Sequence, residues 1–471
     1  YLDFDFLFNI WRVLFLFIVL IIRTTVLMFS FAYINGINVN NFIILYLRFI
    51  FRILWLIVNN NFYWMILGWD GLGVVSFLLI VFYTNTESIN NGLFTLFQNR
   101  VGDLFFVLFI VGVLDLVIWN SLTLKYGLIF LILGRCVKRA QFPFNAWLLA
   151  AIRAPTPISS LVHSSTLVVA GVFILLQYRY CLTRILLLLK FIRILSLIIR
   201  SFGLINEGDI KKLIAYSTIN HVSLIIFILS FELYKIVYFH LNIHAIFKSL
   251  IFMCFGFVIL SSYHAQDKRL VSYYFINPIV KLFYYFACLC LGGLPFLRAF
   301  FSKDLIIEKM IELSIERLFI FILLLTLRLR IYYSIKLLKL NKVVNSLNII
   351  EKNFLGGFRV ILIFILMIIV INIYLRLVFR LTLEFFSSKI FIYLIIIIMF
   401  GLSLLTNLNF KINFYSKFIN WKEIWFLNLI KIDQFMYWNM FVIINYVRNL
   451  TQIKFILLIN WWVIVIFIVL F

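Results

Sequence analysis

The segment from residue 138 to residue 166 places ionisable side chains and helix breakers inside sequence apolar enough to lie in a bilayer. The residues concerned are Lys138, His163, Pro143, Pro155 and Pro157. A charge at the membrane centre costs about 2.5–3.5 kcal/mol, and broken helical backbone is tolerated there only where protein or a water-filled cavity satisfies it. Lysine exchanges its proton readily when desolvated, whereas arginine stays charged. We therefore expect this segment to line a path for protons or ions.

A second group of charged residues precedes this segment. Asp70 lies among glycines in the middle of an apolar run, where a lone carboxylate needs a cation or a proton. The alternative is that Asp70 merely caps a helix end beside a loop. Arg100 and Asp103 are three residues apart and can pair on one helix face, so a purely structural ion pair is the alternative for them. A carboxylate that moves relative to Lys138 would change how tightly that lysine holds its proton.

His240, His244 and Lys248 follow one another at intervals of four residues. On a helix, each step of four turns by about 40°, so the three side chains form one polar stripe on an otherwise apolar surface. The pattern favours a hydrogen-bonded proton relay. Zinc binding by the two histidines is the alternative, but no glutamate follows the first histidine and no third carboxylate ligand is evident.

Two more lysines flank this stripe. Lys212 follows Asp209 at the start of an apolar run, where it can act in proton transfer or as an interfacial anchor. Lys303 comes after the helix-breaking sequence Gly-Gly-Leu-Pro at 292–295, as Lys138 comes beside Pro143. Broken helices at matching places in two halves of a chain are a sequence sign of a transporter site built from structural repeats. The halves are then roughly 62–178 and 200–306.

The elements that must position these residues are membrane-spanning helices. Of the 471 residues, 65% are hydrophobic, 19% are aromatic and only 13% are charged, with a mean hydropathy of +1.11, which excludes a soluble globular protein. The apolar runs are continuous, which favours helices over a membrane barrel, and about 14 of them reach spanning length. We therefore predict an all-α polytopic membrane protein.

The net charge of +24 is scattered between and within the apolar runs, which favours contacts with anionic lipid head groups over nucleic-acid binding.

The sequence shows none of the common cofactor motifs. Its five cysteines lie in or beside apolar segments without C-x-x-C spacing, so they are predicted to be small core residues. It contains neither a Walker-type loop nor a G-x-G-x-x-G after a strand, which disfavours a nucleotide site. There is no initiator methionine, and the start looks incomplete, processed or unusually encoded.

The hydropathy pattern divides the chain into spans and regions. Spans are predicted at 12–33, 42–58, 62–83, 93–118, 124–150, 158–178, 182–200, 209–230, 237–262, 276–306, 317–338, 357–380, 388–406 and 453–471. The regions are N-terminal helices at 1–61, a first repeat at 62–200, a second repeat at 201–338, further transmembrane helices at 339–406, an amphipathic helix at 407–452 and a terminal anchor at 453–471.

These motifs together resemble the chain 5 family of mitochondrial NADH–ubiquinone oxidoreductase, the distal antiporter-like membrane subunit of respiratory complex I. The match is carried, in order, by GWDGLG (68–73), NRVGD (99–103), KRAQFPFNAWL (138–148), APTPISSLVHSST (154–166), DIKKLIAYST (209–218), HAIFKSLIF (244–252) and FFSKD (300–304). It covers about 62–306. Beyond 306 it rests on hydropathy and on an amphipathic segment followed by an anchor, which looks like the family's lateral helix, shortened.

The resemblance implies two inverted five-helix repeats, each contributing half a proton channel. It assigns Asp70 as the first-half acid that modulates Lys138, and Asp103 as a neighbouring acid. It makes His163 the link between the halves, His240, His244 and Lys248 the central relay, and Lys303 the exit lysine. Lys212 joins this set of proton-translocation residues.

The sequence also departs from the family pattern. Asp70 stands where many relatives have the longer glutamate, and Leu149 replaces a proline. His221 and Ser223 stand where the family has glutamine and glycine. Relatives begin with two further helices, so we expect another polypeptide to supply them or accessory subunits to cover the site.

The function that the resemblance implies is proton translocation coupled to electron transfer from NADH to ubiquinone, in the mitochondrial inner membrane. NADH, FMN, iron–sulfur clusters and ubiquinone would be bound by other subunits, and this chain would hold no cofactor or metal. Expected partners are the neighbouring antiporter-like chain 4, other membrane-arm and accessory subunits, and anionic lipids such as cardiolipin. The alternatives are a subunit of the related cation/proton exchanger and a chain kept only for structure, although idle charges in a membrane would be costly.

Overall fold

The computed structural model describes eleven main stretches of the chain. These are residues 8–34, 39–114, 121–142, 144–152, 154–162, 167–177, 208–262, 266–267, 278–293, 298–312 and 317–338, with a few isolated positions between 190 and 204. Within these stretches the regular elements are helices, and the only β-pairing is an isolated bridge between Asp209 and Asp267. Six of the described helices are long and apolar enough to cross a membrane. The prediction of an all-α polytopic membrane protein is confirmed.

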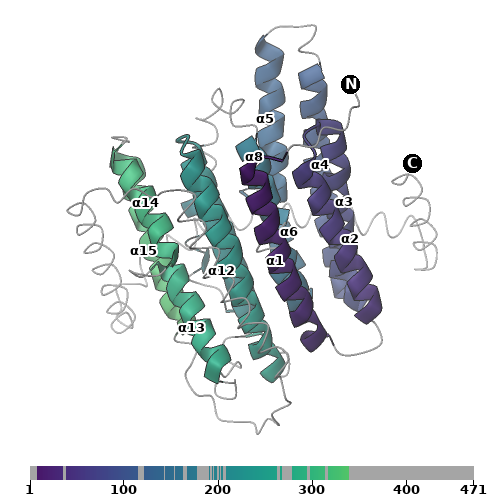
Figure 1. The fold of residues 1–471 in the computed structure, drawn as a ribbon, viewed down its shortest axis with the longest axis vertical. Coiled ribbons are helices and arrows are strands. Elements are labelled where there is room, and N and C mark those ends of the chain that lie inside the picture. The colour runs from purple at the N-terminus through teal and green to yellow at the C-terminus, as the bar shows by residue number, and fades with distance from the viewer. Residues whose placement is uncertain are drawn as a thin grey trace, which may run out of the picture.

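The N-terminal part of the described chain is a row of long helices. They are α1 (Ile10–Tyr33), α2 (Val39–Val58), α3 (Phe62–Ile80) with the short 3-10 turn η1 (Val81–Tyr83), α4 (Thr86–Leu114) and α5 (Ser121–Lys138). The pairs α2–α3, α3–α4 and α4–α5 contact each other along the chain order, and α2, α3, α4 and α5 gather on one side of Figure 1. These helices carry the first group of charged residues.

The rest of the described chain surrounds a single central helix. Its elements are α6 (Ala146–Ala151), α7 (Thr156–Ser159), α8 (Leu167–Gln177), α11 (Ile210–Leu229), α12 (Tyr234–Ser261), α13 (Pro278–Gly292), α14 (Arg298–Glu312) and α15 (Arg317–Leu338). Helix α12 contacts α1, α7, α8, α11, α13 and α14, and it runs through the middle of Figure 1. The most apolar stretch of α12 is 94% buried, compared with 33% for α2, so polar groups on α12 face protein on every side.

Three predicted spans are each divided into two helical segments. The span 124–150 is α5 and α6, the span 158–178 overlaps α7 and α8, and the span 276–306 is α13 and α14. Hydropathy does not register these divisions because it is averaged over a window longer than the connecting segments. Helix α4 starts at Thr86 rather than at residue 93, since its first two turns are polar. The spans at 182–200 and beyond residue 338 lie outside the continuously described residues, and the inverted relation of the repeats stays a prediction.

The divided helices leave carbonyl groups that need donors inside the membrane. At the end of α5, Ala140 takes a left-handed conformation with φ 52°, and the Trp147 indole donates to the Val137 carbonyl at 2.7 Å. At the end of α13, Gly293 has φ 76° and Lys303 donates to the Leu291 carbonyl at 2.6 Å. The helix breaks are therefore stabilised by side chains from the next segment.

Candidate functional site

The first group of charged residues meets where α3, α4 and α5 converge. Helices α4 and α5 approach closely at Gly102 and Gly134, where a Cβ on Gly134 would lie 2.9 Å from the Gly102 carbonyl oxygen. Because Asp103 follows Gly102, and Lys138 lies one turn beyond Gly134, this approach brings the two side chains together. The glycines thus position the pair.

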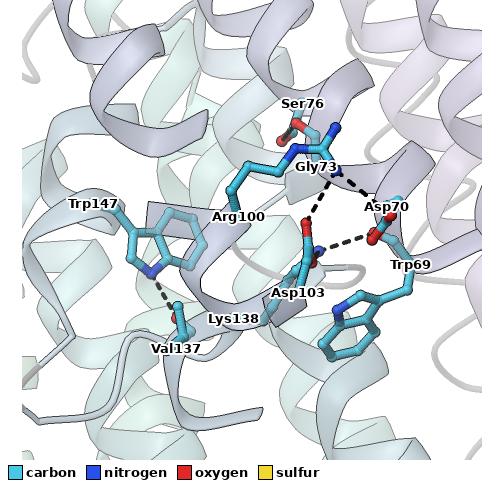
Figure 2. A network of polar contacts seen from close by, with 9 residues as sticks. All are labelled: Trp69, Asp70, Gly73, Ser76, Arg100, Asp103, Val137, Lys138 and Trp147. Atoms are coloured by element: carbon cyan, nitrogen blue, oxygen red, sulfur yellow. Dashed lines mark hydrogen bonds and ion pairs between the residues drawn. The ribbon is translucent and has the colours of Figure 1, made fainter. Parts of the chain in front are cut away.

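Lys138 forms a buried ion pair with Asp103. Its Nζ lies 2.9 Å from Asp103 Oδ1, and the two side chains are 2% and 9% exposed. The same ammonium donates to the Trp69 carbonyl at 2.9 Å and lies 4.6 Å from the centroid of the Trp69 ring. Figure 2 shows the lysine reaching from α5 into this space between α3 and α4. Lys138 is the last residue of α5, so its ammonium reaches an acid at the point where the helix breaks.

Asp70 does not meet Lys138 directly. Arg100 lies between the two acids, with its Nη1 3.5 Å from Asp70 Oδ2 and 3.7 Å from Asp103 Oδ2. Figure 2 shows the guanidinium bridging the carboxylates while Lys138 binds the far side of Asp103. The resemblance made Asp70 the acid that modulates Lys138; in the structure Asp103 contacts the lysine and Asp70 pairs with Arg100. The predicted Arg100–Asp103 pair is present, but it belongs to this larger network.

The two lysines at the start of α11 have different surroundings. Lys212, which the sequence interpretation selected, is 38% exposed and pairs with Asp209 at 2.7 Å. Its neighbour Lys211 is buried and donates to the Ala154 carbonyl at 2.5 Å, in the turn between α6 and α7. Lys211 is therefore the lysine of this pair that reaches the interior. The sequence shows two adjacent lysines, and only the orientation of α11 about its own axis decides which of them is buried.

The predicted stripe on α12 is buried inside the helix bundle. His240, His244 and Lys248 are 2%, 4% and 0% exposed. His240 Nδ1 lies 2.8 Å from the Ser302 hydroxyl of α14, and Lys248 donates a hydrogen bond to the Ser217 hydroxyl of α11. The stripe therefore connects α11 on one side with α14 on the other.

Lys303 lies beside Ser302 on α14 and turns back to the end of α13. Its Nζ donates to the Leu291 carbonyl, and a Cβ on Gly293 would lie 2.8 Å from that Nζ. The predicted association of Lys303 with a helix break is confirmed, since the glycine leaves room for the ammonium. The neighbouring Asp304 is also buried.

Sequence reasoning missed two site residues on α15. Arg330 is completely buried and donates to the backbone carbonyl and the side-chain oxygen of Asn220, at 3.1 and 3.3 Å. The Tyr333 hydroxyl lies 3.1 Å from His221 Nε2. The only available signal was an arginine in the middle of an apolar run. His221 was noted as a departure from the family pattern, and it lies 5.4 Å from the His244 ring, measured between centroids.

Some predicted features lie outside the described residues, including His163 and Pro143. Of the residues that are described, no group of His, Cys, Asp and Glu has an arrangement that could hold a metal ion. The four described cysteines are buried thiols outside any disulfide, as expected for small core residues. The described site is thus a series of lysines, histidines, hydroxyls and buried acids, which are groups that can accept and release protons.

Comparison with protein families places residues 59–328 in the family described as "NADH:quinone oxidoreductase/Mrp antiporter, TM". The chain is 39% identical over 335 residues to NADH-ubiquinone oxidoreductase chain 5 of Anopheles arabiensis, a match that covers 68% of this chain and 86% of that one. It is 38% identical over 346 residues to chain 5 of Aedes aegypti, covering 70% of this chain and 60% of that one. This chain therefore matches less than two thirds of the longer relative.

A solved structure has the same fold. It comes from the membrane-bound sulfane sulfur reductase, an archaeal respiratory membrane complex, with a TM-score of 0.71, 20% identity, and coverage of 79% of this chain and 81% of that one. The family match includes the Lys138–Asp103 pair, the stripe on α12 and both helix breaks, and it ends just before Arg330 and Tyr333. The chain belongs to the NADH-ubiquinone oxidoreductase chain 5 family, a group of multi-pass antiporter-like membrane subunits.

Proposed function

We propose that this chain translocates protons across the mitochondrial inner membrane as a membrane-arm subunit of a respiratory NADH:ubiquinone oxidoreductase. The names of its relatives support the assembly, and the buried Lys138–Asp103 pair supports the proton chemistry. That pair is the observation on which the proposal mainly rests. A lysine and a carboxylate in contact at bilayer depth are costly to maintain, so their retention calls for a role.

Asp103 can act as the movable partner in this pair. One of its oxygens faces Lys138 at 2.9 Å and the other faces Arg100 at 3.7 Å. Arginine stays protonated, so Arg100 offers a permanent alternative partner for the carboxylate. When Asp103 moves towards Arg100, Lys138 loses its counterion and its proton becomes easier to release. The return of Asp103 favours reloading of the lysine.

The released proton then passes to the second cluster. The proposed route runs from Lys138 by way of His163 to Lys248, and continues through the cluster that contains His240 and His244 to Lys303. The contacts of Lys248 with Ser217 and of His240 with Ser302 support its second part. His163 and ordered water near mid-membrane complete the route between the halves. Lys211 reaches the Ala154 carbonyl between α6 and α7 and supplies charge near this connection, and Lys212 follows it at the start of α11.

The oxidation–reduction steps belong to other subunits in this proposal. NADH, FMN, the iron–sulfur clusters and ubiquinone are bound elsewhere, and this chain contributes no redox centre. The residue types support this division, because the family motifs here contain lysines, histidines and acids rather than cysteine ligands at cluster spacing. Energy from electron transfer therefore reaches this chain through changes in its neighbours.

One neighbour is proposed to be the antiporter-like chain 4, docked on the face formed by α3 and α4. Arg100 and Asp70 have side chains that are 44% and 36% exposed in the single chain, and exposed apolar residues surround them, namely Leu67, Leu104, Val107, Leu108 and Val111. Half-exposed charges amid apolar side chains are unfavourable against lipid. A protein partner with polar groups at the same depth would shield them. Accessory subunits and anionic lipids such as cardiolipin complete the expected surroundings.

The Lys138→Met variant tests the proposal, because it removes the exchangeable proton and keeps a long apolar side chain. In the purified complex reconstituted into vesicles, we expect at least about tenfold slower proton pumping and slower coupled NADH oxidation, with assembly largely retained. Lys235→Met is the matched control, since Lys235 is an exposed lysine at the start of α12. Unchanged pumping in the Lys138→Met complex would refute the proposed role.

A cation/proton exchanger subunit is the second candidate, because the matched family description includes Mrp antiporters. The two candidates differ in what co-purifies with the chain and in ion dependence. Flavin and iron–sulfur subunits in the same particle, with pumping independent of Na⁺, support the first. A particle without redox subunits, whose proton flux requires Na⁺, supports the second.

A further inference from the structure

A small cavity lies between α11, α12 and α13, next to the second cluster. Its lining includes three histidines, His221, His240 and His244, together with apolar residues and Cys290. The His221 ring lies 5.4 Å from the His244 ring and 6.0 Å from the His240 ring, measured between centroids. The cavity is about the size of one water molecule.

The histidine nitrogens around this cavity lack hydrogen-bond partners among the described residues. These buried nitrogens are Nδ1 of His221, Nε2 of His240 and both ring nitrogens of His244. The surface of this cavity is mostly apolar, so a water bound there would depend on these nitrogens for the two to four polar partners that it needs. A water there would connect His221 with both histidines of α12.

The other nitrogen of His221 leads away from the cavity to α15. His221 Nε2 lies 3.1 Å from the Tyr333 hydroxyl. The Ser217 side chain lies near that hydroxyl, and its own hydroxyl donates to the Ile214 carbonyl of α11. Ser217 in turn accepts a hydrogen bond from Lys248. The contacts therefore connect Lys248, Ser217, Tyr333 and His221 in sequence, each through a group that can both give and receive a proton.

The same route continues beyond the cavity to the last lysine. His240 contacts the Ser302 hydroxyl through Nδ1 at 2.8 Å, and Ser302 precedes Lys303 in α14. A direct route along α12 would have to use His244, which makes no hydrogen bond to a described residue. The route through α15 has a hydrogen bond from Lys248 to Ser217 and another between Tyr333 and His221.

We propose that His221 and Tyr333 carry the proton from Lys248 towards His240 and Lys303, and this rests on the proposed function. The Lys248 ammonium gives a proton to Ser217, whose own hydroxyl proton passes to Tyr333. Tyr333 passes its hydroxyl proton to Nε2 of His221. His221 then releases the proton on Nδ1 to the cavity water and so to His240. Lys248 ends neutral, and the hydroxyls regain their protons.

His221 suits this role in a way that the family's glutamine does not. An imidazole accepts a proton at one nitrogen and releases another from the second, whereas a carboxamide only donates and accepts hydrogen bonds. Arg330 holds α15 against α11 through Asn220, the residue before His221. The charged or titratable groups around His221 are His240, His244 and Lys248 of α12, Lys303 of α14, and Arg330 and Tyr333 of α15.

Two single variants in the reconstituted complex test this route. His221→Gln restores the family residue and can still bond to Tyr333, while Tyr333→Phe keeps the ring and removes the hydroxyl. We expect each to slow proton pumping at least about tenfold without loss of assembly. The double variant should be no slower than the slower single variant, because both act on one path. Tyr284→Phe is the matched control, since Tyr284 is a buried tyrosine whose hydroxyl points to the Leu337 carbonyl at 3.4 Å.

The pH profile and a Lys248 variant distinguish a failure of the route through α15 from a failure of the proposed function. His221→Gln should also change the pH dependence of pumping, which a purely structural role would leave unaltered. If Lys248→Met stops pumping while both His221→Gln and Tyr333→Phe pump normally, the route through α15 is wrong and the proposed function stands. If Lys248→Met also pumps normally, the proposed function of the second cluster is wrong. Should His221→Gln fail to assemble, Tyr333→Phe decides the question alone.

Discussion

The first and second charged clusters compensate their buried cations in different ways. Around α3, α4 and α5, Lys138 and Arg100 share the carboxylates of Asp103 and Asp70. Around α11, α12, α14 and α15, the buried cations contact only neutral oxygen atoms of the described residues. Lys248 contacts a hydroxyl, Lys303 a carbonyl, and Arg330 the amide groups of Asn220.

From this difference we expect the two halves to hold protons differently. A nearby carboxylate offsets the cost of a buried ammonium, and the first cluster supplies such a carboxylate to Lys138. A hydroxyl or carbonyl offsets less of this cost, so an added proton is held less firmly in the second cluster. The first cluster is thus suited to storing a proton and the second to passing it on.

Asp103→Asn should have the largest effect, because it removes the only acid that contacts Lys138 among the described residues. We expect pumping to fall at least about tenfold, and the complex to lose about 3–5 kcal/mol of stability because a buried charge is left unpaired. Vesicle pumping and thermal unfolding measure the two effects. Asp70→Asn is the comparison, and its smaller effect should reflect an exposed pair. Equal losses from both variants would contradict the assignment of Asp103 as the principal acid.

Gly293→Ala should disturb the second cluster at its helix break. The backbone there has φ 76°, and the added Cβ would lie 2.8 Å from Lys303 Nζ. The left-handed conformation alone costs about 1–2 kcal/mol for alanine. We expect a lower unfolding temperature and slower pumping. Gly208→Ala is the control, because the nearest atom to its Cβ would be Asp267 Oδ1 at 3.8 Å. Similar behaviour of the two variants would contradict the proposed need for a glycine at the break.

Lys211→Met and Lys212→Met should differ, although the residues are adjacent. Lys211 satisfies the buried Ala154 carbonyl, so its loss should cost about 1–3 kcal/mol. Lys212 pairs with Asp209 near the surface, where an ion pair contributes about 0–1 kcal/mol. Thermal unfolding of the two complexes measures the difference. A larger loss for Lys212→Met would reverse the assignment of the interior lysine.

Asn220→Asp places a carboxylate beside Arg330, whose contacts in the second cluster are with neutral oxygen atoms. Asn220 already accepts from Arg330, and a charged acceptor should strengthen that contact by about 1 kcal/mol. We expect a slightly higher unfolding temperature together with slower pumping, because the new carboxylate holds positive charge beside the proton route. Asn242→Asp, on α12, serves as the comparison for a new acid placed elsewhere. Faster pumping in the Asn220→Asp complex would contradict the storage and transfer roles assigned to the clusters.

The amino-acid sequence by itself determined the class of fold and most residues of the site. Hydropathy predicted α1, α2, α11, α12 and α15 closely, because long apolar runs leave the backbone no alternative to a helix in a bilayer. The intervals of four residues predicted the stripe of His240, His244 and Lys248, because side-chain direction follows from helical geometry alone.

Only the tertiary structure decided which partner each charge has. The choice of Asp103 over Asp70 depends on the approach of α4 and α5 at Gly102 and Gly134, and that approach involves residues far apart in sequence. The packing of α11 likewise decides that Lys211 rather than Lys212 is buried. Arg330 and Tyr333 belong to the site because they contact Asn220 and His221, which lie more than 100 residues earlier in the sequence. Helical periodicity gives the direction of a side chain on its own helix, but the neighbour that it meets is set by packing between helices.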